Sequence, residues 1–180
     1  MRIISGEFGG RVWHPPKGLP VRPTTDRTKE ALFNRLSHAI NWEDTSVLDL
    51  FAGTGNISLE CWSRGAKEVV SVDKHPGCVR AIKEIKARWH ISGGKVIRKD
   101  VRSFLKGEAT PFDLVFMDPP YAMPQQEALV AMIMERWLAP EGTLVVEHAP
   151  QVNFRSLPGF DEERKYGSSH LSFFHSTPQP

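Results

Sequence analysis

Residues 47–55 have the sequence Val47-Leu48-Asp49-Leu50-Phe51-Ala52-Gly53-Thr54-Gly55, and this stretch decides the fold. Its apolar first half predicts a short buried strand, and its two glycines allow the chain to turn sharply into a helix that extends to about Ser63. Doubly wound α/β sheets bind ligands at the carboxyl ends of such strands. We therefore expect a ligand site at this turn.

The rest of the chain alternates predicted strands with predicted helices. Strands are expected at residues 68–73, 95–98, 113–117 and 142–147, and helices at 27–40, around 79–89 and at 125–138. This alternation implies right-handed βαβ units and a parallel sheet. Two last strands, 160–166 and 171–174, predict a hairpin at one sheet edge. The expected fold is α/β, with a mostly parallel seven-stranded sheet, helices on both faces and a C-terminal hairpin.

The N-terminal segment is rich in glycine, proline and arginine. It predicts a small β-hairpin of residues 2–5 and 11–14, then an extended path, and then a helix capped by Asp26. Residues 1–39 hold seven lysines and arginines against three acids, whereas the remaining chain holds 16 against 18. A basic arm of this kind favours phosphate contact or, equally, a solvated surface. The arginines that are candidates for this phosphate contact are Arg2, Arg11, Arg22 and Arg27.

Length and composition narrow the class of protein. The 180 residues predict one domain, made of an arm at 1–24, a catalytic core at 25–175 and a flexible tail at 176–180. No apolar run is long enough to cross a bilayer and the N-terminus does not resemble a secretory signal, so we expect a cytoplasmic monomer with no membrane contact. Cys61, Cys78 and the scattered histidines form no metal-ligand pattern, which predicts no metal.

The glycine turn suits a ligand with a positively charged portion. A nicotinamide dinucleotide fingerprint requires a third glycine, and here Ser58 occupies that position. Asp49 precedes the turn, where its charge would repel a pyrophosphate but attract an amino group, such as that of a methionine moiety. A turn with a purely structural role is the alternative.

Two further acids stand at strand ends. Asp73 closes the second strand, where an acid commonly accepts hydrogen bonds from both ribose hydroxyls; the alternative is a helix cap before Pro76. Asp100 follows the third strand and is placed either to bind an adenine amino group or to cap the segment that begins at Val101.

The most specific motif is Asp118-Pro119-Pro120-Tyr121, directly after an apolar strand. Two prolines end the strand in a rigid loop. Asp118 and the carbonyl of Pro119 can each accept one N–H of a planar nucleobase amino group and so direct its lone pair at a sulfonium methyl group. Tyr121 offers a face on which an extruded base can stack. Positioning of this kind supplies much of the rate.

Residues 49–55 and 118–121 together resemble the class I amino-methyltransferases, which have a Rossmann-like fold. Further stretches make the chain similar, to about Phe174, to the bacterial 16S rRNA guanine-N2 methyltransferases. These stretches are Arg2-Ile3-Ile4-Ser5-Gly6 followed by Gly10-Arg11, Arg22-Pro23-Thr24-Thr25-Asp26-Arg27 continuing to Glu30-Ala31-Leu32-Phe33-Asn34, and Ser63-Arg64-Gly65-Ala66.

The resemblance implies transfer of a methyl group from S-adenosylmethionine to N2 of one guanine in 16S rRNA, within the assembling small ribosomal subunit, with S-adenosylhomocysteine as product. It implies that Asp118 and Tyr121 hold the guanine. The residues implied to hold the cofactor, together with their immediate neighbours, are Thr24, Asp49, Phe51, Ala52, Gly53, Gly55, Asp73, Lys74, Asp100 and Val101. The chain departs from the family pattern at Asp73-Lys74-His75, where a glutamate is more usual, and at Asn56-Ile57-Ser58.

Three other functions are compatible with parts of this pattern. A DNA adenine or cytosine amino-methyltransferase would share the Asp-Pro-Pro-Tyr chemistry, but no segment is long enough for a target-recognition region. A protein glutamine methyltransferase would share the loop, although the basic arm favours phosphate. A catalytically silent cofactor- or RNA-binding protein would have no need for both Asp118 and Tyr121.

Overall fold

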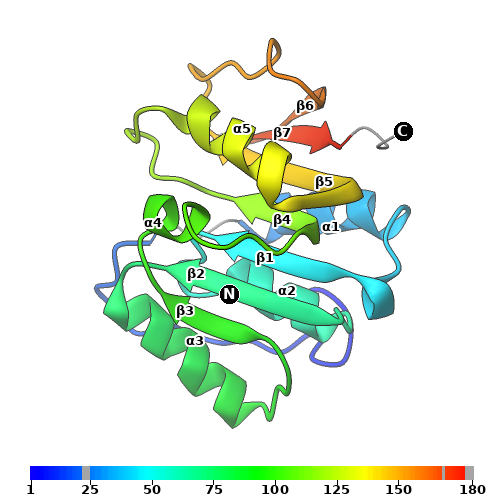
Figure 1. Ribbon diagram of the computed structural model, residues 1–180. Helices are drawn as coiled ribbons and strands as arrows, with labels where there is room; N and C mark the ends of the chain where they lie inside the picture. The colour runs from blue at the N-terminus through cyan, green and yellow to red at the C-terminus, as the bar shows by residue number, and fades with distance from the viewer. Residues whose placement is uncertain (22–24, 168, 177–180) are drawn as a thin grey trace.

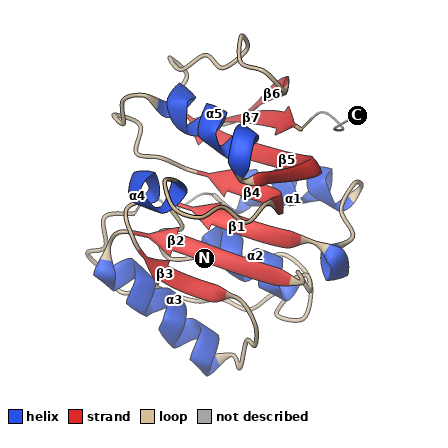
Figure 2. Ribbon diagram, viewed as in Figure 1, coloured by secondary structure: helices blue, strands red, loops and turns tan. Residues whose placement is uncertain are grey.

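The computed structural model describes residues 1–21, 25–167 and 169–176, and forms one seven-stranded sheet with helices on both faces (Figure 1, Figure 2). The strands are β1 (Ser46–Leu50), β2 (Glu68–Asp73), β3 (Lys95–Arg98), β4 (Phe112–Met117), β5 (Leu138–His148), β6 (Phe160–Tyr166) and β7 (Ser169–His175). The helices are α1 (Asp26–Ser37), α2 (Asn56–Ser63), α3 (Pro76–Arg88), α4 (Val101–Leu105) and α5 (Gln126–Arg136), with a short 3-10 helix at Trp42–Asp44.

The strand order is β3-β2-β1-β4-β5-β7-β6. The first five strands are parallel, and β7 pairs antiparallel with both β5 and β6. The predicted α/β class and the C-terminal hairpin at one sheet edge are therefore confirmed. From β1 the chain continues to β2 and β3 on one side, and to β4 and β5 on the other. This reversal between β1 and β4 is the position at which such sheets bind ligands.

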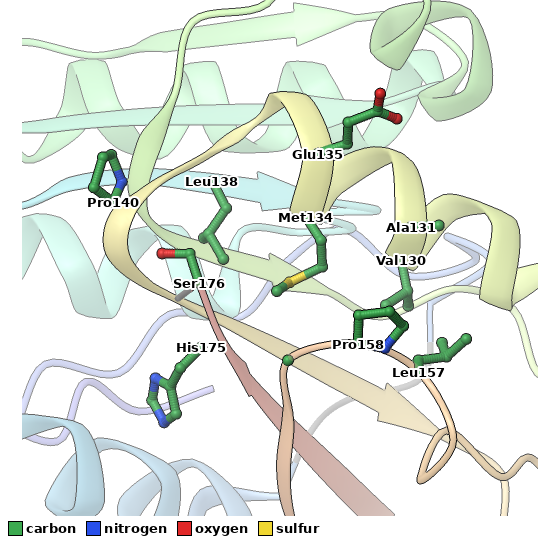
Figure 3. Close-up of a pocket in the computed structure, with 11 residues that line it drawn as sticks. Val130, Ala131, Met134, Glu135, Leu138, Pro140, Leu157, Pro158, His175 and Ser176 are labelled. Carbon is green, nitrogen blue, oxygen red and sulfur yellow. The ribbon is translucent and has the colours of Figure 1, made fainter. Parts of the chain in front are cut away.

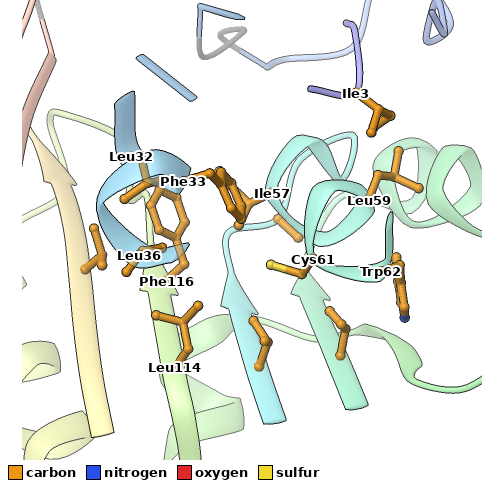
Figure 4. Close-up of a cluster of buried hydrophobic side chains, with 14 of the residues drawn as sticks. Ile3, Leu32, Phe33, Leu36, Ile57, Leu59, Cys61, Trp62, Leu114 and Phe116 are labelled. Atoms are coloured by element: carbon orange, nitrogen blue, oxygen red, sulfur yellow. The ribbon is translucent and has the colours of Figure 1, made fainter. Parts of the chain in front are cut away.

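Alternation along the strands gives each face its own core. Val47 of β1 packs on the face that holds α1, α2 and α3, while Leu48 and Leu50 pack on the opposite face with α4 and α5. Figure 4 shows the first of these cores, where Phe33 and Leu36 of α1 and Ile57 of α2 lie over Leu114 and Phe116 of β4. Both faces of the central strands are thus buried, as expected of a parallel sheet.

Three local predictions need correction. The helix cap is Thr25, whose hydroxyl accepts the Thr28 N–H at 3.1 Å, and not Asp26, which is the first helical residue. That helix ends at Ser37 rather than at residue 40. The N-terminal hairpin is present but shorter than predicted: Arg2 and Val12 form an antiparallel bridge, and backbone hydrogen bonds join Met1 to Trp13 and Ile3 to Arg11 and Gly10. The division into arm, core and tail stays a prediction.

A buried ion pair fixes the N-terminal segment to the core. Lys29 and Glu60 are fully buried, with 3.3 Å between Nζ and Oε2. Lys29 Nζ also donates to the carbonyl of Arg2 at 2.5 Å, and Glu60 accepts the N–H groups of Ile4 and Ser5 at 2.8 and 3.1 Å. Burial lowers the pKa of Lys29, and the Glu60 carboxylate opposes that shift.

The first turn of this segment packs directly on the end of α2. Gly6 has a φ of +86°, and a Cβ placed on it would lie 1.8 Å from the Ser63 carbonyl oxygen, so only glycine fits there. The same carbonyl accepts the Glu7 N–H at 2.7 Å.

Within the described ranges no helix is both long and apolar enough to cross a membrane.

Candidate functional site

Both glycines of the turn after β1 have the positive φ angles that glycine favours, 55° at Gly53 and 82° at Gly55. Phe51 also has a positive φ, 59°, although it is not a glycine. A Cβ on Gly55 would lie 2.9 Å from Cγ1 of Ile82, so this glycine allows α3 to pack against the start of α2. The turn is therefore shaped both by backbone conformation and by close helix packing.

Asp49 lies at the carboxyl end of β1, with 2% of its surface exposed. Its Oδ2 accepts the Ser58 N–H at 3.0 Å and, in a short hydrogen bond, the Ser58 hydroxyl. Burial raises the pKa of Asp49 to about 7, while these hydrogen bonds oppose the shift. Ser58 occupies the position at which a dinucleotide-binding turn has its third glycine. Its hydroxyl donates to the Asp49 carboxylate, which explains why a serine stands there.

Asp73 joins the two loops that follow β1 and β2. Its Oδ2 accepts the Gly53 N–H at 2.8 Å, and its Oδ1 accepts the His75 N–H at 2.7 Å. It does not cap α3: His75 is the cap, and Pro76 is the first helical residue. The carboxylate therefore holds the glycine turn beside the start of α3 and keeps one further acceptor site on each oxygen.

Asp100 caps α4 through a hydrogen bond from the Ser103 N–H to Oδ1 at 3.1 Å. Capping was one of the two roles open to it from sequence. The second oxygen, Oδ2, and one further acceptor site on Oδ1 remain for a ligand.

The Asp-Pro-Pro-Tyr loop leaves β4 beside the end of β1. Leu50 and Met117 are register partners, and the Asp118 N–H continues the ladder to the Leu50 carbonyl oxygen at 3.4 Å. The Met123 N–H closes the loop on the Pro120 carbonyl oxygen at 2.8 Å. Pro119 is buried, and Asp118 and Tyr121 are half-buried. The loop is thus anchored at both ends, directly across the ligand-binding position from the glycine turn.

One cavity of about 700 Å³ brings the two loops together. It is lined by most of the residues predicted for the site: Asp49, Phe51, Ala52, Gly53, Asp73, Lys74, Asp100, Val101, Asp118, Pro119, Pro120 and Tyr121. Gly55 is not among the residues that line it, and Thr24 falls outside the described residues. Among the described residues no group of three His, Cys, Asp or Glu side chains is placed to hold a metal ion.

Several residues that line the cavity were not predicted from the sequence. Met1, Pro15, Pro20 and Val21 of the N-terminal segment line it, and no local signal marks them. Glu147 lines it as well; it is 3% exposed, and Oε1 accepts the Ser169 hydroxyl at 2.7 Å. Its position as an acid near the end of a buried strand, like that of Asp49 or Asp73, is the signal that could have found it.

A second cavity, of about 430 Å³, lies between α5 and the ends of β5 and β7 (Figure 3). Figure 3 shows Met134 and Leu138 directed toward it, with His175 and Pro158 nearby. It contains none of the residues predicted for the site.

The predicted RNA-binding arginines are in different surroundings. Arg2 forms an ion pair with Asp26 at 3.5 Å. Arg11 is exposed and lies over the Phe8 and Trp89 rings at 5.0 and 5.7 Å. Arg27 is exposed, and Arg22 lies outside the described residues. Arg2 lies near the other two described arginines, because it is bridged to Val12 beside Arg11 and paired with Asp26 beside Arg27.

Comparison with known proteins gives the family. Residues 1–175 match the family model described as "Conserved hypothetical protein 95". The chain belongs to this family. It is 32% identical over 159 residues to "Ribosomal RNA small subunit methyltransferase D" of Escherichia coli K12, covering 88% of this chain and 79% of that protein. It is 34% identical over 182 residues to "Putative rRNA methyltransferase YlbH" of Bacillus subtilis 168, covering 97% and 98%.

Solved structures agree with the family at the level of fold. "Putative methyltransferase yhhF" from E. coli has a TM-score of 0.88, 31% identity and 99% coverage of both chains. The 16S rRNA N2 G1207 methyltransferase (RsmC) of T. thermophilus, solved with AdoMet and guanosine, has a TM-score of 0.71 and 23% identity, covering 88% of this chain and 45% of that one. The Rossmann-like methyltransferase fold predicted from the resemblance is confirmed.

Proposed function

We propose that this protein transfers a methyl group from S-adenosylmethionine to the exocyclic N2 of a guanine in 16S rRNA of the small ribosomal subunit. The observation that carries the proposal is that one cavity holds both the Asp118–Tyr121 loop and the three strand-end acids Asp49, Asp73 and Asp100. The names of the family relatives support the reaction and the rRNA substrate. Within the described residues Val12 is the one large hydrophobic side chain that is exposed, which supports action as a monomer. This substrate would place the reaction in the cytoplasm.

The cavity suits the cofactor because its acids match the cofactor's donors. We assign Asp49 to the methionine amino group, Asp73 to the ribose hydroxyls and Asp100 to the adenine amino group. Each carboxylate keeps acceptor sites beyond the hydrogen bonds that it accepts from the protein. Phe51, Ala52, Gly53, Lys74 and Val101 complete the walls, Gly55 shapes the turn behind them, and Thr24 is assigned to the methionine end by resemblance alone.

The cofactor supplies a methyl group on a positively charged sulfur. Asp118 and the Pro119 carbonyl accept the two N–H bonds of the guanine amino group and direct its lone pair at that methyl. Pro119 and Pro120 fix the backbone, so the acceptors are in place before the substrate arrives. Tyr121 stacks on the extruded base. As the C–N bond forms, the methyl–sulfur bond would break and S-adenosylhomocysteine would be left as the neutral thioether. Asp118 can accept the proton that the nitrogen then loses, and no strong base is required before transfer.

The basic N-terminal segment would contact the substrate's phosphates. Arg11 and Arg27 are exposed and suited to this role, and we keep Arg2 and Arg22 among the candidates. Arg2 would exchange its exposed ion pair with Asp26 for a phosphate, an exchange of little net cost because exposed pairs contribute at most about 1 kcal/mol.

Incubation with labelled S-adenosylmethionine tests the proposal directly. We expect label in small subunits isolated from cells lacking the modification, at a single guanine that mass mapping identifies as N2-methylated. Naked 16S rRNA in a parallel reaction shows whether the assembled particle is required. Label in duplex DNA or in a glutamine-containing protein, with none in rRNA, would replace the proposal with one of the other amino-methyltransferase classes. Cofactor binding with no transfer to any substrate would identify a silent binder.

A further inference from the structure

Charge is strongly segregated along the chain. Residues 74–106 hold ten lysines and arginines against two acids, whereas residues 40–73 and 107–180 together hold six against sixteen. The basic stretch covers α3 and β3, at the β3 edge of the sheet, and runs on into α4, which lies beside α5 on the opposite face from α3 (Figure 1). We call the exposed cations around α3 and β3 the basic edge: Lys74, Arg80, Lys83, Arg88, Lys95, Arg98 and Lys99.

The basic edge differs from the N-terminal segment in how its charges are used. In the part of the chain that the structure describes, no cation of the basic edge lies within ion-pair distance of an acid. In the N-terminal segment, Lys29 is buried against Glu60, and Arg35 pairs with Asp161 and Glu162. Arg11, Lys17 and Arg27 of the N-terminal segment are exposed as well, but the basic edge has more exposed cations and so holds the larger share of the charge available to an external anion.

The basic edge begins at the rim of the cofactor cavity. Lys74 lines the cavity, Arg98 is the register partner of Asp73, and the Lys99 N–H donates to the Asp73 carbonyl oxygen at 3.1 Å. From this rim α3 leads away, with Arg80 and Lys83 one helical turn apart on its exposed side.

At the far end of α3 the basic edge meets the arm. Trp89 follows the helix and stacks on Phe8 with 5.6 Å between ring centroids, and the Arg11 guanidinium lies over both rings. The 13 residues of α3 span about 20 Å. In duplex DNA each strand has a phosphate about every 3.4 Å along the helix axis, and on that scale this length corresponds to roughly six phosphates.

Protection of a sheet edge explains only part of this pattern. β3 is an edge strand, and cations on an edge strand prevent pairing with another chain. That role accounts for Lys95 and Arg98, but not for Arg80 and Lys83, which lie on a helix. A solvated surface would also not require the acids to be so few in this segment.

We propose that the basic edge binds the phosphate backbone of the RNA that flanks the methylated guanine, and that it guides this backbone from the far end of α3 to the cavity rim. The proposal rests on the RNA substrate proposed above. The acidic remainder of the chain repels phosphates and so favours one orientation of the RNA.

Paired charge reversals test the basic edge. We compare R80E/K83E and K95E/R98E with the matched control R155E/K165E, which changes the same charges on an exposed part of the C-terminal region. Lys74 is left unchanged because it lines the cofactor cavity. The measurements are affinity for a 16S rRNA fragment and for small subunits between 50 and 200 mM salt, methylation kinetics, and binding of S-adenosylhomocysteine as a check on folding.

We expect each basic-edge variant to bind RNA at least about tenfold more weakly than the control at low salt. Its plot of log affinity against log salt should be shallower by about 0.7 to 0.9 for each phosphate that the variant no longer binds. We also expect a raised KM for RNA, a nearly unchanged kcat and unchanged S-adenosylhomocysteine binding.

Two outcomes would overturn the proposal for the basic edge, and a third would overturn the proposed function. Basic-edge variants equal to the control, alongside a wild type that methylates rRNA, would overturn this inference alone. Weaker binding to intact subunits but not to naked RNA would point to an acidic protein partner and also overturn it. A wild type that methylates no RNA would instead overturn the proposed function.

Discussion

The two walls of the cofactor cavity are held rigid by different means. The wall after β1 and β2 is fixed by carboxylates that accept backbone N–H groups: Asp49 from Ser58, and Asp73 from Gly53 and His75. The wall after β4 is fixed by covalent structure, because Pro119 and Pro120 restrict the backbone between hydrogen bonds at either end.

This difference follows from what each wall does. The first wall must present negative charge and close backbone approach to a cofactor that binds and leaves, and its acids serve both the fold and the ligand. The second wall must hold an amino group at one angle, which favours acceptors that cannot relax. A change in the first wall should therefore affect both structure and cofactor affinity, whereas a change in the second should affect the methyl-transfer step.

The largest expected effect tests the second wall. Asp118→Ala removes one of two acceptors for the guanine amino group, and we expect kcat to fall by about 10²- to 10³-fold, the usual loss for one preorganised hydrogen-bonding group. The affinity for S-adenosylhomocysteine should stay within about twofold of wild type. Single-turnover methylation and a cofactor titration measure the two quantities.

Glu127→Ala is the matched control, since Glu127 is an exposed acid in the first turn of α5. If Asp118→Ala weakens cofactor binding as much as it slows methyl transfer, then the second wall does not act on the transfer step alone, and the distinction between the two walls is wrong. A loop that also supports the cofactor would give that result.

A smaller effect is expected in the first wall. Asp73→Ala removes the acceptor of the Gly53 and His75 N–H groups as well as the proposed ribose contact. Hydrogen bonds to a charged group contribute about 1.5–3 kcal/mol, so cofactor affinity should fall by about 10- to 100-fold. At saturating cofactor, kcat should recover most of its wild-type value.

Thermal unfolding of the Asp73→Ala variant adds a second measurement. The midpoint should fall, because two loop N–H groups lose their acceptor. An unchanged midpoint with unchanged cofactor affinity would show that Asp73 supports neither the loops nor the ligand.

Local sequence patterns predicted the first wall well. The bounds of β2 and β3 are those expected, and Gly53 and Gly55 have the positive φ angles that glycine favours, whereas no sequence signal marks the positive φ of Phe51. The loop at Asp118–Tyr121 was also predicted from residues that are adjacent in the chain. These features depend on residues close together in the chain, so their pattern is visible without the fold.

Features that depend on distant residues were missed. Lys29 belongs to a basic segment by sequence but is buried against Glu60, which comes from α2. Glu147 joins the cavity only because β5 lies beside β4. The basic edge, in contrast, belongs to one continuous stretch of sequence, and it is masked only in the total charge after residue 39, where acids elsewhere in the chain offset its cations.

The smallest expected effect concerns the charge of Asp49. Its pKa is raised to about 7, above the ordinary value for an unfolded chain, so the folded state holds a proton that the unfolded state has lost between about pH 4 and 7. Wild-type stability should therefore decline relative to Asp49→Asn as the pH rises through that window. Binding of a cationic amino group requires the ionised form, so cofactor affinity should rise with pH by about tenfold per unit below 7 and level off above it.

Ser58→Ala sharpens this prediction. It removes the hydroxyl that donates to Asp49, one of the hydrogen bonds that hold its pKa down, and leaves the Ser58 backbone N–H in place. The pH at which cofactor affinity levels off should therefore move upward, while affinity at high pH changes little. Calorimetric titrations with S-adenosylmethionine between pH 5.5 and 7.5 measure the curve, and Asp49→Asn should give a flat one. A wild-type curve that is itself flat would mean that Asp49 remains ionised throughout and that the first wall offers the cofactor a permanent negative charge.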